Sequence, residues 1–191
     1  QSQVRPEINY TFATGLRHIL RQDPNVIMVG EIRDKETANL AVHAALTGHI
    51  VLSTLHTNDC LGAIPRLIDL GVERFLIPST LNLVVAQRLI RTLCPECKRK
   101  QALKGEKREI FLKEIESLPE ERKKELNIST LSKEKEIFIF APTGCKKCNQ
   151  TGYLGRIGIF EFLSMTDQLA ELILKEPTRA LLEKEFRRQG G

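Results

Sequence analysis

One stretch, Val26 to Asp34, restricts the fold of this chain more than any other. Its first four residues, Val26 to Val29, form an unbroken apolar run, which predicts a strand buried on both faces of a sheet. Gly30 ends the run, and the carboxylate of Glu31 follows where such a strand leaves the sheet. Ligands of open α/β sheets bind at the carboxyl ends of the strands, so Glu31 is placed for chemistry. An isolated acid after a strand more often only opens a loop, so the surrounding sequence must decide between the two interpretations.

Helical patterns and a second strand surround this stretch. Thr11 is placed to cap a helix whose apolar face has four members: Phe12, Leu16, Ile19 and Leu20. Asp34 is placed to cap a second helix, which Gly48 ends. A second buried strand, Ile50 to Leu55, leads into the polar segment His56 to Asp59. Strands that alternate with helices in short units predict an α/β fold with a parallel sheet covered by helices.

The rest of the chain predicts further elements. A third helix covers roughly Leu61 to Leu70 with Pro65 in its first turn, and a fourth runs from about Ser79 to Leu93. Residues 103–126 have charged helical spacing, and residues 136–141 predict a strand. A turn leads into a further strand over 152–160, and two helices over 167–175 and 178–188 close the chain. The pattern divides the chain into an α/β core (1–93), a cysteine-bearing subdomain (94–160) and a C-terminal helical segment (161–191).

Two pairs of cysteines mark the second of these parts. Cys94 and Cys97 form one CxxC turn, Cys145 and Cys148 form another, and 47 residues separate the pairs. Four thiolates supplied by two such turns can complete a tetrahedral shell around structural zinc. A single CxxC would leave a thioredoxin-like redox site open, but two pairs without a disulfide-rich context favour zinc. Cys60 stands apart and is predicted to be an ordinary buried thiol.

Composition excludes some classes of protein and leaves others open. The chain has 191 residues, 41% hydrophobic and 28% charged, as in a globular protein. It contains no run of 18 apolar residues and no basic-then-apolar leader, so neither a membrane span nor a signal peptide is predicted. The net charge of +5 would suit an anionic partner, but basic and acidic residues are interleaved and tryptophan is absent. Both ends look arbitrary, and we expect a fragment of a longer protein.

Several motifs of this chain together resemble one family. They are Thr11 to Ala13 with Gly15 to Arg17, Leu20 to Pro24, Gly30 to Asp34, Thr47 to His49, Leu55 to Asp59, the two CxxC pairs, and Thr151 to Tyr153 with Gly155 and Arg156. In these motifs the chain resembles the C-terminal part of the secretion and pilus-assembly ATPases, the motors of type II secretion and type IV pili. The four cysteines resemble the secretion and pilus-assembly branch rather than the retraction branch.

The resemblance implies a fold and an active site. The fold is the C-terminal part of a RecA-like P-loop ATPase core with a small tetracysteine zinc-binding subdomain and C-terminal helices. Val26 to Asp34 matches the family's atypical Walker B strand, in which Glu31 carries the catalytic role and can orient the attacking water. His49 and His56 match the family's histidine box. His56 is expected beside Glu31 as a γ-phosphate sensor, whereas His49 is equally well explained as a packed or capping histidine.

The resemblance also implies arginine positions, ligands and partners. Arg17, Arg21, Arg33 and Arg156 match positions that contact phosphate or a neighbouring subunit, although each alone is more often a solvated surface residue. The expected ligands are structural Zn²⁺ in this chain, with ATP and Mg²⁺ in the full-length protein. The expected partners are five further copies in a hexamer, an inner-membrane platform and cytoplasmic assembly proteins, without nucleic acid. The expected location is peripheral, on the cytoplasmic face of the inner membrane.

The sequence departs from the family pattern in ways that limit the prediction. No G-x-x-x-x-G-K-[ST] phosphate-binding loop occurs, and the family's acidic box is missing. We therefore expect the isolated chain to be inactive, although the full-length protein would be an ATP hydrolase. Two alternatives stay open: a non-catalytic, zinc-stabilised interaction module or remnant, and a basic zinc-ribbon protein that binds nucleic acid. A longer protein with a phosphate-binding loop would favour the motor, and salt-dependent DNA binding would favour the last alternative.

Overall fold

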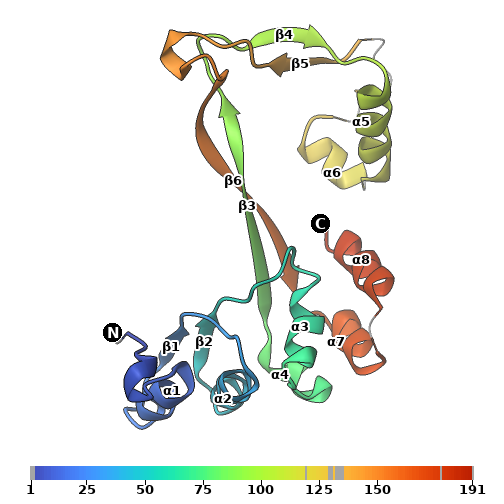
Figure 1. Ribbon diagram of the computed structural model, residues 1–191. Helices are drawn as coiled ribbons and strands as arrows, with labels where there is room; N and C mark the ends of the chain where they lie inside the picture. The colour runs from blue at the N-terminus through green and yellow to red at the C-terminus, as the bar shows by residue number, and fades with distance from the viewer. Residues whose placement is uncertain (1–2, 119, 129–130, 132–135, 177, 191) are drawn as a thin grey trace. The chain divides into compact units, whose positions relative to one another are not determined.

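The computed structural model describes residues 3–118, 120–128, 131, 136–176 and 178–190 (Figure 1). The chain divides into two compact units, one formed by residues 3–86 with 161–189 and the other by residues 87–160. The first unit contains η1 (Pro6–Ile8), α1 (Phe12–Leu20), β1 (Val26–Val29), α2 (Lys35–Leu46), β2 (Ile50–Ser53), α3 (Ala63–Asp69), η2 (Arg74–Leu76), α4 (Ile77–Thr80), α7 (Asp167–Leu174) and α8 (Arg179–Arg188). The second contains β4 (Arg99–Ala102), α5 (Glu106–Ser117), α6 (Glu120–Glu125), β5 (Phe138–Ala141) and η4 (Lys146–Cys148). The strands β3 (Leu83–Leu93) and β6 (Tyr153–Ser164) contribute to both units.

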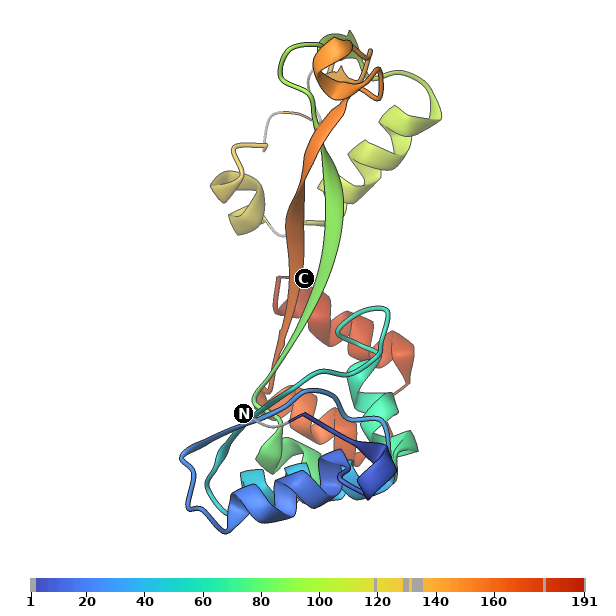
Figure 2. The same cartoon turned by 60° about the vertical axis from the view of Figure 1, so that its left-hand side comes forward.

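The central strand pair of the first unit is parallel, as predicted. β1 pairs with β2 in a register that sets Val26 opposite Ile50 and Val29 opposite Ser53. The helices α1 and α2 lie against one face of this pair (Figure 2). Ile27 and Val29 point to that face and are buried in the core of the unit. The alternation of buried and exposed residues is the period of two that a strand imposes.

The prediction that Val26 to Val29 are buried on both faces is wrong for the described chain, and so is the prediction that the second strand is buried. Val26, Met28, Ile50 and Leu52 are 54%, 73%, 60% and 52% exposed. The reason is that the described helices packed against these strands cover only the face that carries Ile27. An apolar run in the sequence records the hydrophobicity of both faces of a strand, but not which of them is covered in the chain at hand.

The predicted helix from Ser79 to Leu93 is also wrong, because most of that segment is strand β3. Leu81 has extended backbone (φ −95°, ψ 109°), which ends α4 after one turn. β3 pairs with β6, and hydrogen bonds join Met165 N–H to Asn82 O at one end and Cys94 N–H to Gly152 O at the other. From the first of these bonds to the second, the residue numbers rise along β3 and fall along β6, so the strands are antiparallel.

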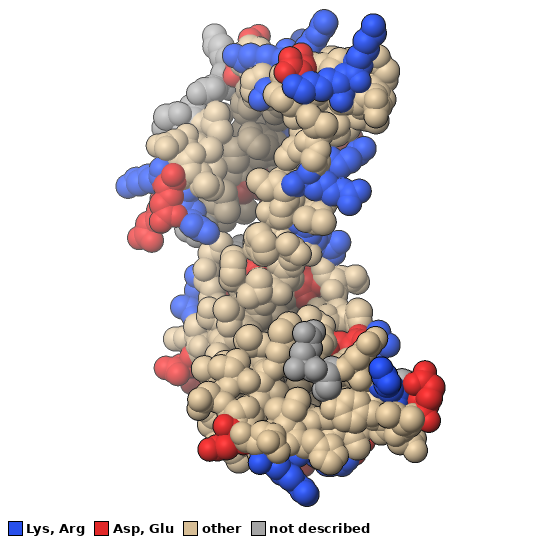
Figure 3. All heavy atoms as spheres, turned by 90° about the vertical axis from the view of Figure 1, so that its left-hand side faces the viewer, with Lys and Arg blue, Asp and Glu red and all other residues tan. Residues whose placement is uncertain are grey.

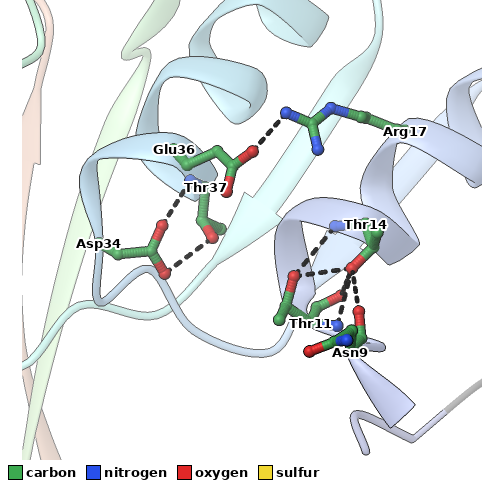
Figure 4. Close-up of polar contacts among 7 residues, drawn as sticks. All are labelled: Asn9, Thr11, Thr14, Arg17, Asp34, Glu36 and Thr37. Carbon is green, nitrogen blue, oxygen red and sulfur yellow. Dashed lines mark hydrogen bonds and ion pairs between the residues drawn. The ribbon is translucent and has the colours of Figure 1, made fainter. Parts of the chain in front are cut away.

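The predicted N-caps of the first two helices are confirmed (Figure 4). Thr11 Oγ1 accepts from the Thr14 amide at 3.2 Å, and Thr14 Oγ1 accepts from the Thr11 amide at 2.8 Å, a reciprocal capping box. Asp34 Oδ1 accepts from the Thr37 amide at 2.8 Å and its Oδ2 accepts from the Thr37 hydroxyl at 3.0 Å. These contacts satisfy amides that would otherwise lack partners, and they fix where the chain turns into α1 and α2.

The C-terminal helices pack on the first unit through apolar side chains and one buried carboxylate. Leu169 and Leu182 are 1% exposed and belong to the same core as Ile27. Glu185 on α8 is only 5% exposed. Its carboxylate accepts from Arg188 at 2.6 and 2.7 Å, from Thr166 Oγ1 at 2.8 Å, and from the side-chain amide of Gln189 at 2.9 Å. The Arg188 guanidinium is the main cause that lowers the pKa of Glu185 to about 2, although burial opposes the shift. The Gln189 amide and the Thr166 hydroxyl lower it further.

Acid should selectively weaken this carboxylate contact. The folded pKa of Glu185 lies below its ordinary value of 4.5, so its stabilisation is present above pH 4.5 and is lost as pH falls toward 2. We expect Glu185→Gln to lower the free energy of unfolding by about 2 kcal/mol near pH 7, and the difference from the parent to shrink steadily below pH 4.5. Denaturant titrations of both proteins at a series of pH values measure this. Glu183→Gln, an exposed carboxylate on the same helix, is the control and should retain the acid sensitivity of the parent.

The second unit is built on a short antiparallel sheet. β4 pairs with β5, with Lys100 opposite Phe140 and Ala102 opposite Phe138. Leu103 and Ile137 are buried at the end of this sheet, where the Leu103 amide donates to Ile137 O at 2.7 Å, and Ile115 is buried on α5. The predicted helical segment 103–126 and strand 136–141 therefore exist, as α5 and α6 and as β5.

Positive charge is concentrated on the second unit. Residues 87–160 contain 17 Lys and Arg against 10 Asp and Glu, whereas the rest of the chain contains 12 against 14. Figure 3 shows several of these basic side chains grouped on one face of the unit. The interleaving seen along the sequence therefore conceals an uneven distribution between the units. None of the helices in the described part of the chain combines the length and apolar character needed to cross a membrane.

Candidate active site and candidate metal centre

The carboxyl ends of β1 and β2 bring two polar loops together. Because the strands are parallel neighbours, residues 30–34 and 54–59 leave the sheet at the same edge. Two hydrogen bonds join these loops: the Ile32 amide donates to Thr54 O at 3.0 Å, and Thr54 Oγ1 donates to Gly30 O at 2.7 Å. Sequence reasoning did not identify Thr54 as a residue of this site, since its contact depends on the register between the strands.

Glu31 and His56 meet at this edge, as predicted. His56 Nε2 lies 2.9 Å from Glu31 Oε2, and Arg33 makes an ion pair with the same carboxylate oxygen. The side chain of Glu31 is 19% exposed, whereas those of His56 and Arg33 are 72% and 66% exposed. The hydrogen bond from His56 is the largest effect on the pKa of Glu31 and lowers it; burial opposes this, and the Arg33 contact lowers the pKa further. The carboxylate is therefore ionised at neutral pH and can accept a hydrogen bond from a water molecule.

Of the four predicted arginines, Arg33 alone contacts Glu31 among the described residues. Arg17 makes an ion pair with Glu36 in the first turn of α2, close to the Asp34 cap (Figure 4). Arg21 is exposed at the end of α1, and Arg156 is exposed on β6 in the other unit. Arg17 and Arg21 are therefore not equivalent, because Arg17 on α1 makes an ion pair with α2, whereas Arg21 lies at the C-cap of α1.

His49 lies at the other end of β2 from His56. Its Nδ1 is 3.0 Å from Ala44 O and 3.1 Å from Thr47 Oγ1, at the C-terminal end of α2. A histidine that bonds the last carbonyl groups of a helix is a capping residue. The geometry thus agrees with the capping alternative for His49, and it separates the two members of the histidine box.

The four predicted cysteine ligands come together in the second unit. The sulfur atoms of Cys94, Cys97, Cys145 and Cys148 lie within 4.8 Å of one another. Three of the pairs, 94–145, 97–148 and 145–148, are 3.9, 3.9 and 3.8 Å apart. A tetrahedron of zinc–sulfur bonds of about 2.3 Å has edges of roughly 3.8 Å, so these spacings fit a four-coordinate metal. They are far longer than the roughly 2 Å of a disulfide bond, and all four cysteines are free thiols.

Backbone amides and an ion pair support this cluster. The amides of Cys145 and Gly152 donate to Cys148 Sγ at 3.3 and 3.1 Å. Burial raises the pKa of this thiol, but these amides and the contacts with the Cys145 and Cys97 side chains lower it to about 6. Lys147, in one CxxC turn, pairs with Glu96, in the other, at 2.9 Å. Gly152 has a φ of +76°, and a Cβ there would lie 2.4 Å from Pro142 Cβ. Glycine is therefore required where the amide approaches the sulfur.

The family model described as type II/IV secretion system protein matches residues 1–190 of this chain. The chain belongs to that family. It is 50% identical over 187 residues to the type II secretion system ATPase E of Vibrio cholerae serotype O1, a match covering 98% of this chain and 34% of that protein. It is 46% identical over 191 residues to the type IV pilus assembly ATPase TfpB of Acinetobacter baylyi, covering 100% of this chain and 30% of that protein. The chain thus spans about a third of the length of these curated relatives, and the resemblance to secretion and pilus-assembly ATPases is confirmed.

Solved structures support the fold. X-ray structures of the ATPase DotB from Legionella pneumophila and from Yersinia pseudotuberculosis match with TM-scores of 0.54 and 0.53, at 21% and 24% identity. The matches cover 95% and 99% of this chain and 36% and 35% of those chains. The predicted fold class is confirmed: the chain shares the α/β fold of these family ATPases and carries four cysteines that could bind a metal.

Proposed function

We propose that this chain is the C-terminal part of a hexameric motor ATPase that couples ATP hydrolysis to type II secretion or type IV pilus assembly. The observation that carries the proposal is the contact between Glu31 and His56 at the carboxyl edge of β1 and β2. In an α/β sheet this edge is where ligands bind. Membership of the secretion family, whose relatives include ATPases, supports the reaction class.

In this proposal the residues at the edge have separate roles. Ionised Glu31 orients and polarises the water that attacks the γ-phosphate of ATP. His56, hydrogen-bonded to Glu31, responds to the γ-phosphate, and Arg33 holds the carboxylate in place. Glu31 would also help to hold Mg²⁺ through water when the metal is bound with ATP, and the metal would supply positive charge that neutralises the phosphates. Arg17, Arg21 and Arg156 would contact phosphate or a neighbouring subunit, where guanidinium groups stabilise phosphoryl charge.

We further infer that the cysteine cluster holds zinc in a structural role. Four sulfur donors at tetrahedral spacing are the donor set that zinc prefers, and they leave no open position for substrate. The proposed location is the cytoplasmic face of the inner membrane, where the hexamer would meet a membrane platform and cytoplasmic assembly proteins.

The isolated chain should not turn over ATP. Its sequence contains no G-x-x-x-x-G-K-[ST] loop to cradle the phosphates, so Glu31 has no bound nucleotide to act on. We expect phosphate release no faster than the buffer background, and measurable release by a longer protein that contains this chain together with such a loop. Steady ATP hydrolysis by the isolated chain that disappears on Glu31→Gln would contradict this prediction.

A further inference from the structure

The loop that carries His56 is also attached to the C-terminal helix. After His56, the chain passes through Asp59 before α3 begins. Asp59 Oδ1 accepts from the Gly62 amide at 2.8 Å, and its Oδ2 accepts from Arg179 Nη2 at 2.7 Å. Figures 1 and 2 both show the segment between β2 and α3 running beside α8. A contact between residues 120 positions apart thus anchors this loop.

Both sides of this contact are held firmly. On the loop, the buried Cys60 donates its amide to Glu161 Oε2 at 3.3 Å and its thiol to Glu161 O at 3.2 Å. On the helix, Glu183 accepts from Arg179 Nε at 3.1 Å and so orients the guanidinium. Glu185 and the buried Leu182 fix α8 to the core. The Asp59 side chain is 23% exposed and that of Arg179 is 62% exposed, so solvent screens this ion pair in part.

We propose that Arg179 is a positioning residue for the candidate active site, which acts through Asp59 to hold the loop that places His56 against Glu31. The proposal rests on the proposed function of Glu31 and His56. One end of the loop is tied to β1 by Thr54, and the other is tied to α8 by Asp59, so His56 lies between two fixed points. Without the guanidinium, Asp59 loses its contact to α8 while its contact to the Gly62 amide stays, so the second fixed point weakens. Displacement of a catalytic group by about 1 Å can cost up to 10²-fold in rate.

The test compares Arg179→Ala, Arg179→Lys and Arg74→Ala in the 191-residue chain. Arg74 makes a similar exposed ion pair with Glu176 at 2.7 Å in the same unit but does not touch the loop, so it is the matched control. Two NMR readouts report on the loop: hydrogen exchange of the Gly62 amide, and the pH titration of the Glu31 carboxyl carbon. His56 lowers the pKa of Glu31, so that titration reports how fully the contact is formed.

We expect Arg179→Ala to speed exchange at Gly62 about tenfold, the effect of losing one charged hydrogen bond, and to raise the pKa of Glu31 toward its ordinary value. Arg179→Lys should cause a smaller increase in Gly62 exchange and a smaller rise in the pKa of Glu31 than Arg179→Ala does. Arg74→Ala should change neither quantity. If Arg179→Ala leaves both readouts unchanged, or Arg74→Ala changes them equally, Arg179 does not position the loop.

A longer protein with the phosphate-binding loop separates this inference from the function on which it rests. There, Arg179→Ala is expected to lower kcat about tenfold with little change in KM, because the substrate-binding groups stay in place. An altered loop with unchanged kcat would refute a role in the active site. If Glu31→Gln has no effect on turnover, the proposed function itself fails, whereas the loop measurements in the isolated chain still decide whether Arg179 holds the loop.

Discussion

Replacing Cys145 with serine is expected to release the metal and to unfold the part of the second unit that holds the two CxxC turns. Among the described residues, the buried cluster at this site consists of Cys94, Cys97 and Cys148, with Cys145 packed against it. No larger apolar side chain takes part among the described residues, so the proposed metal would take the place of a hydrophobic core. Zinc binding contributes about 10–16 kcal/mol to the folding of zinc-finger peptides. For this unit we expect Cys145→Ser to lower the free energy of unfolding by a value on the order of 5 kcal/mol.

Metal analysis and hydrogen exchange together test this expectation. The parent chain should contain about one zinc per molecule, and Cys145→Ser should contain much less. Exchange should accelerate in 87–160 but stay slow around Ile27 and Leu182, which lie in the other unit. Cys60→Ala is the control, since this buried thiol also belongs to the first unit and should leave the metal content unchanged. Stoichiometric disulfides in a metal-free parent protein would contradict the zinc proposal.

Local signals predicted much of the first unit. Thr11 and Asp34 cap α1 and α2 because a short polar side chain before an apolar periodic segment satisfies free amides in the first turn. The polar residues after β1 and β2 meet because the ends of parallel neighbours share an edge of the sheet. The contact between Glu31 and His56 follows from that topology, and their pairing was predictable once the strands were taken as neighbours.

The remaining features depend on contacts between distant residues. Leu83 to Leu93 has enough apolar character for a helix, and only its pairing with β6 makes it a strand. The link from Arg179 to Asp59 was invisible for the same reason, since nothing near either residue in the sequence indicates the other. Likewise, the exposure of Met28 depends on which segments cover the sheet rather than on its own strand. Tertiary context thus overrides local propensity where a partner lies far along the chain.

In a longer protein that contains this chain and a phosphate-binding loop, Glu31→Gln is expected to reduce kcat for ATP by about 10²- to 10⁴-fold. The amide keeps the size of the side chain and can still hydrogen-bond to His56, so the site should retain its shape. It cannot carry the negative charge that polarises water. In the proposed role Glu31 acts on the attacking water rather than on bound nucleotide, so ATP affinity should change little, and the loss should appear in kcat rather than KM.

Steady-state hydrolysis and equilibrium nucleotide binding, measured on the same preparations, distinguish this role from a structural one. Glu73→Gln is the matched control, an exposed carboxylate of the first unit outside the candidate site, and it should leave both quantities unchanged. Equal losses of binding and turnover in Glu31→Gln would indicate that Glu31 only shapes the edge of β1. Full turnover in that variant would mean that a group other than Glu31 activates the attacking water. Selective loss of turnover is the result that follows from an ionised carboxylate held by His56 and Arg33 where two parallel strands end.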